Sequence, residues 1–442
     1  MKPSNYNFFF EFPEENQILA YNSRTASLAL MQPSNYDDYL EFANSLEVTA
    51  LEEEFLKKLR IGGFILDKNI DEIDILSLHL LGNRYNTDVL DLTIATTLNC
   101  NLGCVYCFEK EIRNNKKMSD DVKKSIVRLV EQQAGSIKFL NICWYGGEPL
   151  LDMNVIRDLS SEFLLICENN QIKYNASIVT NGYKLTPDIA SELVEFKVSF
   201  AQVTLDGPDY IHDTRRPLIG GQPTFDRILM NIENSCDIIP ISLRINTDNS
   251  NKADMDSLLE LIVNKNLGSK IGVYLAQVKN ENDCYNTSTC MATSDFTNTA
   301  DEFEEKAYKL GIGSNIYQYP KLTGPYCGAD CANSYVIDPE GYLYNCWAEI
   351  GDISKSFGNL VDYNFEGNTL LKLNYMLYQP QQNENCKECK HLPLCMGGCP
   401  FERINNVGDN CTAIKYNLEK KIKNHARFVI ENQKELKETV EL

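Results

Sequence analysis

The sequence predicts an α/β protein, built around a partial (β/α)6 barrel of the TIM type with a smaller module on each side. Strand-like and helix-like segments alternate over 90–310. Cysteine is absent from 1–89, and eight of the sixteen cysteines follow residue 326. We therefore expect a winged-helix-like α+β module over 1–89, the barrel over 90–310 and a cysteine-rich domain over 311–442.

The first 89 residues read as short strands followed by helices. Segments 7–12 ("NFFFEF") and 17–31 ("QILAYNSRTASLALM") read as short strands, and "NSRT" supplies a turn inside the second. The stretch "TALEEEFLKKLRIGG" predicts a helix with a capping box formed by Thr49 and Glu52. A second helix is expected over "DEIDILSLHLL".

The middle segment gives the clearest prediction. Its expected strands cover 91–97, 137–145, 173–180, 199–205, 240–246 and 271–277. Helices fit between them, for example "SDDVKKSIVRLVEQQAG" with Ser119 as cap. Such alternation implies parallel strands with right-handed crossovers, and active sites of such barrels lie at the carboxyl ends of the strands.

Composition excludes several classes of partner. The net charge of −20 argues against nucleic acid and anionic membranes, and it would attract a basic peptide. No apolar run reaches membrane-spanning length, so we expect no membrane partner. The N-terminus has no signal-peptide pattern, and we expect a cytoplasmic protein in which thiols stay reduced.

Three cysteines crowd into one short stretch, "LNCNLGCVYCFE", at Cys100, Cys104 and Cys107. Clustered thiolates in a reducing compartment indicate metal binding, and the presence of only four histidines favours iron–sulfur clusters. A zinc site with four cysteines is the alternative. Three ligands would leave one iron of a four-iron cluster open to a cofactor or substrate.

This loop resembles the radical S-adenosylmethionine (SAM) superfamily, in which SAM chelates the open iron. The resemblance implies that Tyr106 contacts adenine and that Gly146, Gly147 and Glu148 ("GGE") bind the methionine part of SAM. It further implies Thr204 as a ribose contact and Arg216, in "VTLDGPDYIHDTRRP", as a carboxylate ligand. No catalytic acid or base is identified. Glu109, Tyr344 and Glu349, which lie near cysteines, are expected on the solvated surface.

The later cysteines resemble the SPASM extension of that superfamily, which binds two auxiliary four-iron clusters. The resemblance implies one cluster on Cys327, Cys331, Cys346 and Cys399, and a second on Cys386, Cys389, Cys395 and Cys411. With the first loop this makes three [4Fe-4S] clusters. A pair of zinc sites is the alternative, and the assignment of ligands to the two clusters could be swapped.

Members with this extension act on peptides or proteins. The length and texture of 1–89 resemble the leader-recognition module of enzymes that mature ribosomally made peptides, so we expect a precursor peptide with a leader as partner. The expected product is an oxidative crosslink, with a thioether favoured over a carbon–carbon bond. A flavodoxin-type or ferredoxin-type reductant is also implied.

Three other functions stay open. Anaerobic sulfatase-maturating enzymes share the cluster spacing, but they have an Asp after the cysteine matching Cys346, where this chain has Trp347. A peptide epimerase and a non-enzymatic iron–sulfur electron carrier are the remaining alternatives.

Overall fold

The computed structural model describes residues 1–47, 51–280, 284–313, 317–325, 327–362, 367–407 and 411–440, with side chains up to 432. Thr49, the expected helix cap, lies outside the described residues, but the expected capping box is wrong, since the helix begins at Glu53 with Glu52 as its N-terminal cap residue and has no side-chain cap. The chain divides into two compact units. One comprises 1–84, 315–326 and 378–442, and the other comprises 85–314 and 327–377. The division into three domains that the sequence suggested stays a proposal.

Six parallel strands form the centre of the larger unit. They are β6 (Val89–Thr97), β7 (Phe139–Gly146), β8 (Lys173–Thr180), β9 (Val198–Thr204), β10 (Ile241–Thr247) and β11 (Ile271–Gln277). Each pairs with its sequence neighbour, in the order β11-β10-β9-β8-β7-β6. The partial barrel that the sequence predicts is therefore confirmed, and each strand end agrees with its predicted position to within two residues.

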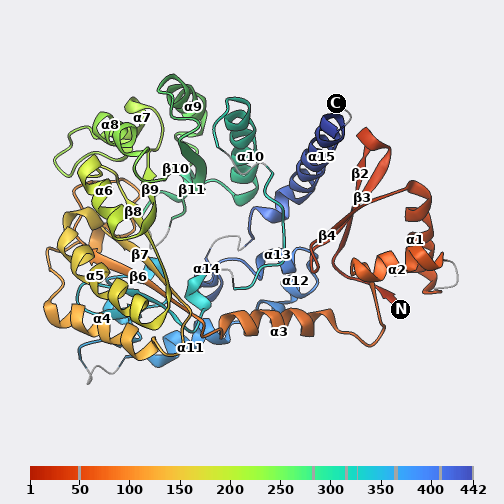
Figure 1. The fold of residues 1–442 in the computed structure, drawn as a ribbon, viewed down its shortest axis with the longest axis horizontal. Helices are drawn as coiled ribbons and strands as arrows, with labels where there is room; N and C mark the ends of the chain where they lie inside the picture. Colours follow the sequence, from red (N-terminus) through yellow and green to blue (C-terminus); the bar gives the residue numbers. More distant parts are fainter. Residues whose placement is uncertain are drawn as a thin grey trace. The chain divides into compact units, whose positions relative to one another are not determined.

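Helices cover the outer face of these strands (Figure 1). They are α4 (Asp120–Gln133), α5 (Met153–Asn170), α6 (Pro187–Glu195), α7 (Asp209–Arg215), α8 (Phe225–Ser235), α9 (Met255–Asn264) and α10 (Thr293–Lys309). Alternate strand residues such as Ile94 and Trp144 are fully buried and pack in one core with helix residues such as Ile126 and Phe163. The predicted cap of α4 is confirmed, since the Ser119 side chain accepts a hydrogen bond from the Val122 amide.

Three short strands continue the sheet beyond β6, and the sequence did not predict them. β12 (Ser334–Ile337) lies parallel to β6, and β13 (Tyr342–Tyr344) and β14 (Gly358–Asn359) follow in antiparallel order. The helix α11 (Thr369–Leu377) belongs to the same unit. Strands of two to four residues have too few positions to show alternation.

The smaller unit contains an antiparallel sheet of β2 (Asn7–Phe12), β3 (Gln17–Asn22) and β4 (Ser27–Met31). The helices α1 (Pro33–Ser45), α2 (Glu53–Ile61) and α3 (Glu72–Arg84) follow, and β1 (Lys2–Pro3) pairs with β5 (Ile65–Leu66). The strands, the turn and the last two helices agree with the sequence prediction. The sequence analysis missed α1.

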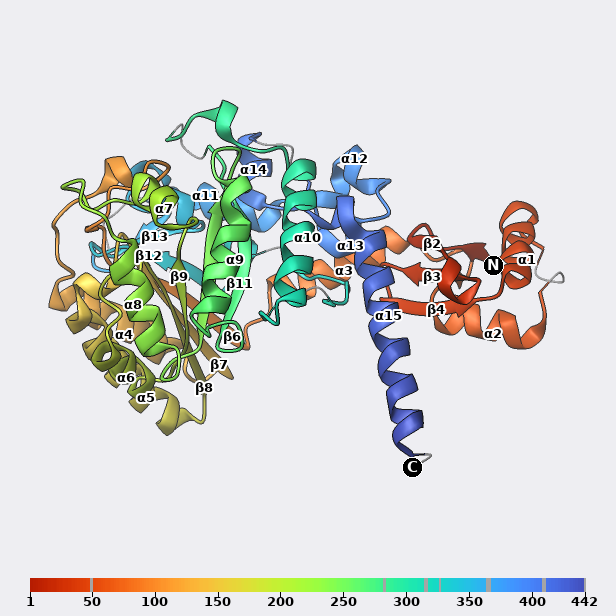
Figure 2. The same ribbon diagram turned by 90° about the horizontal axis from the view of Figure 1, so that it is seen from above.

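The C-terminal part of this unit is helical. It contains α12 (Glu384–Lys387), α13 (Leu392–Cys395), α14 (Pro400–Asn405) and the long α15 (Ile414–Val440). α15 runs beside the β2–β4 sheet (Figure 2), and Leu418 and Ile422 share a core with Phe12 and Leu19. We expected a solvated amphipathic helix, and one face of it is instead part of the N-terminal core. No helix among the described residues is long and apolar enough to cross a membrane.

Candidate functional site

The three-cysteine loop follows β6 at the carboxyl end of the parallel sheet. Hydrogen bonds fix it to the segment after α7: the amide of Gly103 donates to the Pro217 carbonyl (2.7 Å), and the amide of Val105 donates to the Arg215 carbonyl (3.0 Å). Cys100 and Cys104 are buried and Cys107 is partly buried. Two loops therefore hold the thiols at the place where the resemblance puts a cluster.

Burial shapes the chemistry of these thiols. It raises the pKa of Cys100 to about 12 and raises the pKa of Cys104 as well. The same two thiols also interact with one another, and Cys104 interacts with Cys107. Arg113 lies over the loop, where its Nη1 donates to the Leu102 carbonyl (2.7 Å) and its guanidinium bonds Cys107. The charges of Arg216 and Arg113 oppose this rise in the pKa of Cys104, and a bound cation would favour the thiolate form further.

The glycines of "GGE" let two strand ends meet. The amide of Gly147 donates to the Thr97 carbonyl (3.0 Å). A Cβ atom on Gly146 would lie 2.3 Å from the Thr97 carbonyl oxygen, and one on Gly147 would lie 2.4 Å from the Asn99 carbonyl oxygen. Any side chain here would push away the residues directly before Cys100. The glycines thus position the cysteine loop, whatever they contribute to a cofactor.

Glu148 is fully buried next to this contact. Its carboxylate accepts hydrogen bonds from the Thr180 hydroxyl (2.7 Å) and from the amides of Asn181 (2.7 Å) and Leu150 (3.0 Å). Burial raises its pKa despite these donors. The side-chain Nδ2 of Asn181 lies 3.8 Å from the Cys100 sulfur, so the "TNG" turn after β8 (Thr180 to Gly182) reaches the cysteine loop.

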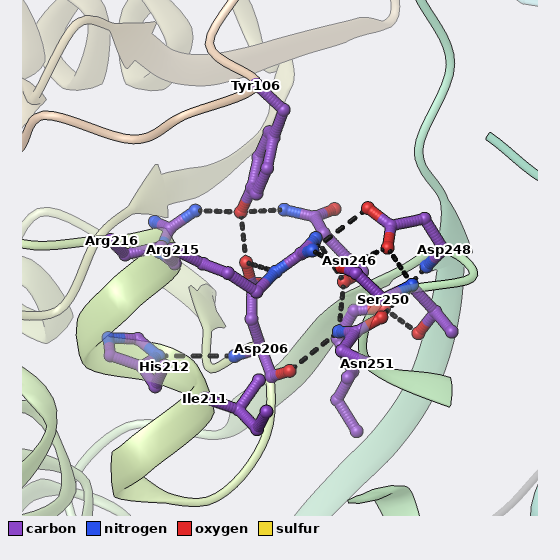
Figure 3. Close-up of polar contacts among 12 residues, drawn as sticks. Tyr106, Asp206, Ile211, His212, Arg215, Arg216, Asn246, Asp248, Ser250 and Asn251 are labelled. Carbon is purple, nitrogen blue, oxygen red and sulfur yellow. Dashed lines mark hydrogen bonds and ion pairs between the residues drawn. The ribbon is translucent and has the colours of Figure 1, made fainter. Parts of the chain in front are cut away.

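Tyr106 is the centre of a buried polar network (Figure 3). Its hydroxyl donates to Asp206 Oδ2 (2.5 Å) and accepts from Arg216 Nη1 (2.7 Å) and Asn246 Nδ2 (2.9 Å). The Arg215 guanidinium lies 5.0 Å from the centre of the ring. With the hydroxyl occupied, only the ring and the backbone of Tyr106 remain to contact a ligand. The structure brings Tyr106 and Arg216 together, as two members of one network.

Arg215 completes this network, and the sequence analysis did not single it out. It pairs with Asp206 (3.1 Å) and Asp248 (2.9 Å) and donates to the Ser250 hydroxyl (2.7 Å). Arg215 directly precedes the predicted Arg216, and Asp248 directly follows β10. The pair of adjacent arginines was visible in the sequence. Its contact with an aspartate 33 positions away was not, because only the folded chain brings the two together.

His212 and Thr224 support the network through hydrogen bonds to the backbone of Asp206 and Arg216. Asp206 donates its amide proton to His212 Nδ1 (3.2 Å), and His212 Nε2 lies 3.1 Å from the Thr224 hydroxyl. That hydroxyl donates to the Arg216 carbonyl (2.7 Å), so Nε2 must be the protonated nitrogen. Burial lowers the pKa of His212 to about 3. Thr204, the expected ribose contact, is buried at the end of β9.

The inner face of the sheet is polar, in contrast to the helix-covered face. Asn141 donates to Asp91 (2.8 Å), and Tyr274 donates to Gln202 (2.7 Å). Trp347 lies on this face, since its indole nitrogen donates to the Thr93 hydroxyl (3.1 Å). These residues alternate with core residues along the strands.

Trp347 also packs on Tyr145 of β7, with ring centres 4.4 Å apart. Tyr145 is hydrogen-bonded to Glu109, a carboxylic acid whose pKa burial raises to about 7. Trp347 is 37% exposed despite these two contacts. The expectation that Glu109 lies on the solvated surface was therefore wrong.

The same expectation was wrong for Tyr344 and Glu349. Tyr344, the last residue of β13, is fully buried, and its hydroxyl donates to Asp338 (2.9 Å). Glu349 is buried and accepts from the Tyr375 hydroxyl (2.9 Å). Both side chains hold the strands and turns around Cys346 together.

The C-terminal cysteines divide between the units. Cys327, Cys331 and Cys346 belong to the larger unit, and Cys386, Cys389, Cys395, Cys399 and Cys411 belong to the smaller unit. Within the smaller unit, Cys386 and Cys395 each interact electrostatically with both Cys389 and Cys411. These four are the thiols that the resemblance assigns to one auxiliary cluster.

The donor atoms at the cysteine loop suit an iron–sulfur cluster and a polar cofactor. Three thiols share one loop beside Arg113, and three buried polar atoms near it have no partner among the described residues: Asn101 Nδ2, Asp206 Oδ1 and Arg216 Nε. Nevertheless, no group of three His, Cys, Asp or Glu side chains in the described part of the chain is already arranged around one metal position. The ligand roles of the cysteines thus remain a proposal.

Comparisons with known proteins agree with this geometry. Residues 94–262 match the model of the Radical SAM superfamily. The cysteine-type anaerobic sulfatase-maturating enzyme of Clostridium perfringens is 23% identical over 331 residues, which cover 68% of this chain and 85% of that enzyme. The radical SAM cyclopropyl synthase TigE of Paramaledivibacter caminithermalis is 24% identical over 388 residues, which cover 80% of this chain and 76% of TigE.

A solved structure extends the likeness over more of the chain. SuiB of Streptococcus suis, bound to its precursor peptide SuiA, superposes with a TM-score of 0.53 and 15% sequence identity. The match covers 91% of this chain and 96% of SuiB. The cysteine loop, the parallel barrel and the family match together identify residues 94–262 as a radical SAM domain.

Proposed function

We propose that this protein is a radical SAM enzyme with a SPASM extension that forms an oxidative crosslink in a ribosomally made precursor peptide. The observation on which the proposal chiefly rests is the cysteine loop at the carboxyl end of the barrel, beside a polar inner face. SAM bound at a [4Fe-4S] cluster supplies, on one-electron reduction, a radical that removes hydrogen from a substrate. A flavodoxin-type or ferredoxin-type protein is the proposed reductant.

The residues of this chain have distinct parts in that proposal. Cys100, Cys104 and Cys107 would hold the cluster, and Gly146 and Gly147 keep their loop in place. Arg216 and Glu148 would bind charged groups of SAM, since both are buried and close to the thiols. Burial of these charges excludes water, which strengthens their interaction with a bound ion.

Thr204 and the ring of Tyr106 would complete the SAM contacts. Both lie at the carboxyl ends of the strands, and the Tyr106 hydroxyl is already engaged within the protein. The eight C-terminal cysteines would hold two auxiliary clusters. The mutual interactions of Cys386, Cys389, Cys395 and Cys411 support the proposed second ligand set.

The N-terminal sheet supports a peptide substrate. β4 pairs with β3 on one side, and no other strand of the described residues pairs with it on the other. A leader peptide could add a strand there, since backbone hydrogen bonds give affinity with little dependence on side chains. The structure of SuiB with its precursor peptide matches 91% of this chain with a TM-score of 0.53. The structure of the sulfatase-maturating enzyme anSMEcpe with a bound peptide matches 78% with a TM-score of 0.59, so a peptide substrate suits either candidate, and the wider coverage favours the precursor peptide.

A sulfatase-maturating activity is the second candidate, because that enzyme class is among the relatives by sequence. Trp347 opposes it. An indole cannot act as the carboxylate base expected after Cys346, and this indole packs on Tyr145 and bonds Thr93. An aromatic surface is better suited to hold a peptide side chain near the inner face. A thioether remains the favoured product over a carbon–carbon bond.

Formation of 5′-deoxyadenosine from SAM and a chemical reductant tests the proposed chemistry. The wild-type protein, reconstituted with iron and sulfide under anaerobic conditions, should form it. A variant with Cys100, Cys104 and Cys107 all changed to Ala should form none. A variant with Cys143, Cys167 and Cys236 changed to Ala is the matched control and should retain it. Equal turnover by the two triple variants would contradict the proposal.

A further inference from the structure

The smaller unit contains a cavity of about 1000 Å³ that the proposed chemistry does not use. Its walls come from the N-terminus and the start of β2, from α1, from the loop before α3, and from the segment that contains Cys386 and Cys389. Every one of these segments belongs to the same compact unit. The size is in the range of pockets that hold small molecules or short stretches of peptide.

Positive charge gathers at this cavity although the chain has a net charge of −20. Lys2, Lys68, Lys387 and Lys390 all line it. Of the ion pairs that the described residues form, none includes Lys2, Lys68 or Lys387. Lys390 is held in place, since its ammonium donates to the Asn7 carbonyl (3.3 Å).

The acidic residues of the cavity do not cancel this charge. Three of them line it: Asp71, Glu72 and Glu388. Glu72 is buried and already neutralised, because it pairs with Arg24 (2.8 Å) and accepts from the Ser4 hydroxyl (2.6 Å). Four lysines therefore face two unpaired carboxylates, so the cavity attracts anions.

The remaining walls suit a peptide more than a free phosphate. Phe9 and Tyr36 lie 4.9 Å apart between ring centres, and both line the cavity with Leu40, which is 39% exposed. Asn7 Nδ2 donates a hydrogen bond to the Tyr39 hydroxyl (2.7 Å), which fixes two polar side chains in the wall of the cavity. Lysines around an aromatic wall match a segment in which carboxylates alternate with apolar side chains.

We propose that this cavity binds an acidic segment of the peptide substrate. The inference rests on the proposed function for the identity of the substrate, and it adds a docking point separate from the edge of β4. It also reverses the electrostatic expectation from composition: although the whole chain would attract a basic peptide, the cavity selects an acidic one. A segment bound there would lie against the residues that flank Cys386 and Cys389.

Fluorescence anisotropy with a labelled peptide of alternating Glu and Ala tests the proposal on the full-length protein. The peptide should bind saturably. A second peptide with Gln in place of Glu should bind at least about tenfold more weakly. Changing both Lys2 and Lys68 to Glu should weaken binding about tenfold or more, and changing both to Gln should have an intermediate effect. The control variant changes Lys57 and Lys58 to Glu. It changes the net charge by the same amount, at exposed positions of α2 outside the cavity, and its affinity for the peptide should stay within about twofold of the wild type.

Two results would overturn the inference: no saturable binding of the Glu peptide, or equal weakening by the control variant. Circular dichroism of each variant shows whether the unit is folded, and the Gln variant decides the matter if the Glu variant is not. 5′-Deoxyadenosine formation by the wild type, measured in the same preparation, tests the proposed function separately. If 5′-deoxyadenosine forms but the peptide does not bind, only this inference is overturned. If the peptide binds but no 5′-deoxyadenosine forms, the result supports the proposed binding at the cavity and overturns the proposed function.

Discussion

Single residues of the site combine a structural task with the proposed chemical one, and Tyr106 shows this most clearly. The aromatic position before the last cysteine was predicted from the sequence, but its partners were not. Three polar groups converge on its hydroxyl, from the loop after β9, the end of α7 and strand β10. Such convergence depends on the tertiary fold, and no local pattern encodes it.

Replacing Tyr106 with Phe should destabilise the protein by about 2 kcal/mol, because buried Asp206, Arg216 and Asn246 lose a hydrogen-bond partner. Thermal unfolding of the protein without SAM measures this. Tyr210 provides the control, since its hydroxyl bonds Asp254 (2.7 Å) at an exposed position, and its change to Phe should cost less than about 0.5 kcal/mol. An equal effect of the two substitutions would show that the Tyr106 network contributes nothing.

Gly147 tests whether backbone contact fixes the cysteine loop. Changing Gly147 to Ala places a Cβ atom 2.4 Å from the Asn99 carbonyl oxygen, so the residues before Cys100 must move. We expect a loss of about 1–3 kcal/mol and a lower iron content after reconstitution. Gly135, where an added Cβ meets nothing within 4 Å, is the control, and its change to Ala should be neutral or slightly stabilising. Full iron content in the Gly147 variant would contradict this assignment.

His212 gives the stability of the protein a pH dependence. Its folded pKa of about 3 lies below the unfolded value of 6.5, so the unfolded chain takes up a proton first as the pH falls. Stability should therefore fall by about 2 kcal/mol between pH 6.5 and pH 5 on account of this group. Urea unfolding at both pH values measures the change.

Replacing His212 with Asn should remove most of that pH dependence, since an amide oxygen can accept the Asp206 amide proton without titrating. Unchanged pH dependence in the His212 variant would contradict the buried, neutral state of this histidine.

At the level of elements, the sequence was most informative where a periodic pattern of apolar residues extends over a long segment. The six barrel strands were predicted to within two residues, because buried residues alternate with more exposed ones along them and helical segments separate them. The short strands β12 to β14 and the helix α1 were missed. α1 begins with Pro33 and has no side-chain cap, and its apolar residues are interrupted by Asp37 and Asp38.

α15 tests the architecture of the smaller unit. Ile422 is fully buried against the N-terminal sheet, so its change to Ala should cost about 2–4 kcal/mol and speed hydrogen exchange in β2 and β3. Val429, which is 36% exposed on the same helix, is the control, and its change to Ala should alter exchange little. Unaltered exchange in the sheet of the Ile422 variant would mean that α15 does not belong to this core.

At the level of the whole molecule, composition predicted the overall charge but not its distribution. The lysines of the cavity stand far apart in the sequence, from Lys2 to Lys390, and only folding brings them to one place. The cysteines differ from the lysines, because the short spacing within each group is a local pattern that indicates a metal site. Which thiols share a cluster depends on how the chain folds, so the sequence left that open.

The central claim is that this chain uses radical chemistry to crosslink a precursor peptide. Its most direct test is the intact mass of the short peptide encoded nearest this protein, after anaerobic coexpression with the wild-type chain or with the triple Cys100, Cys104 and Cys107 to Ala variant. The account predicts that the peptide loses hydrogens in pairs with the wild type only. An unchanged peptide mass in a preparation that forms 5′-deoxyadenosine would contradict it.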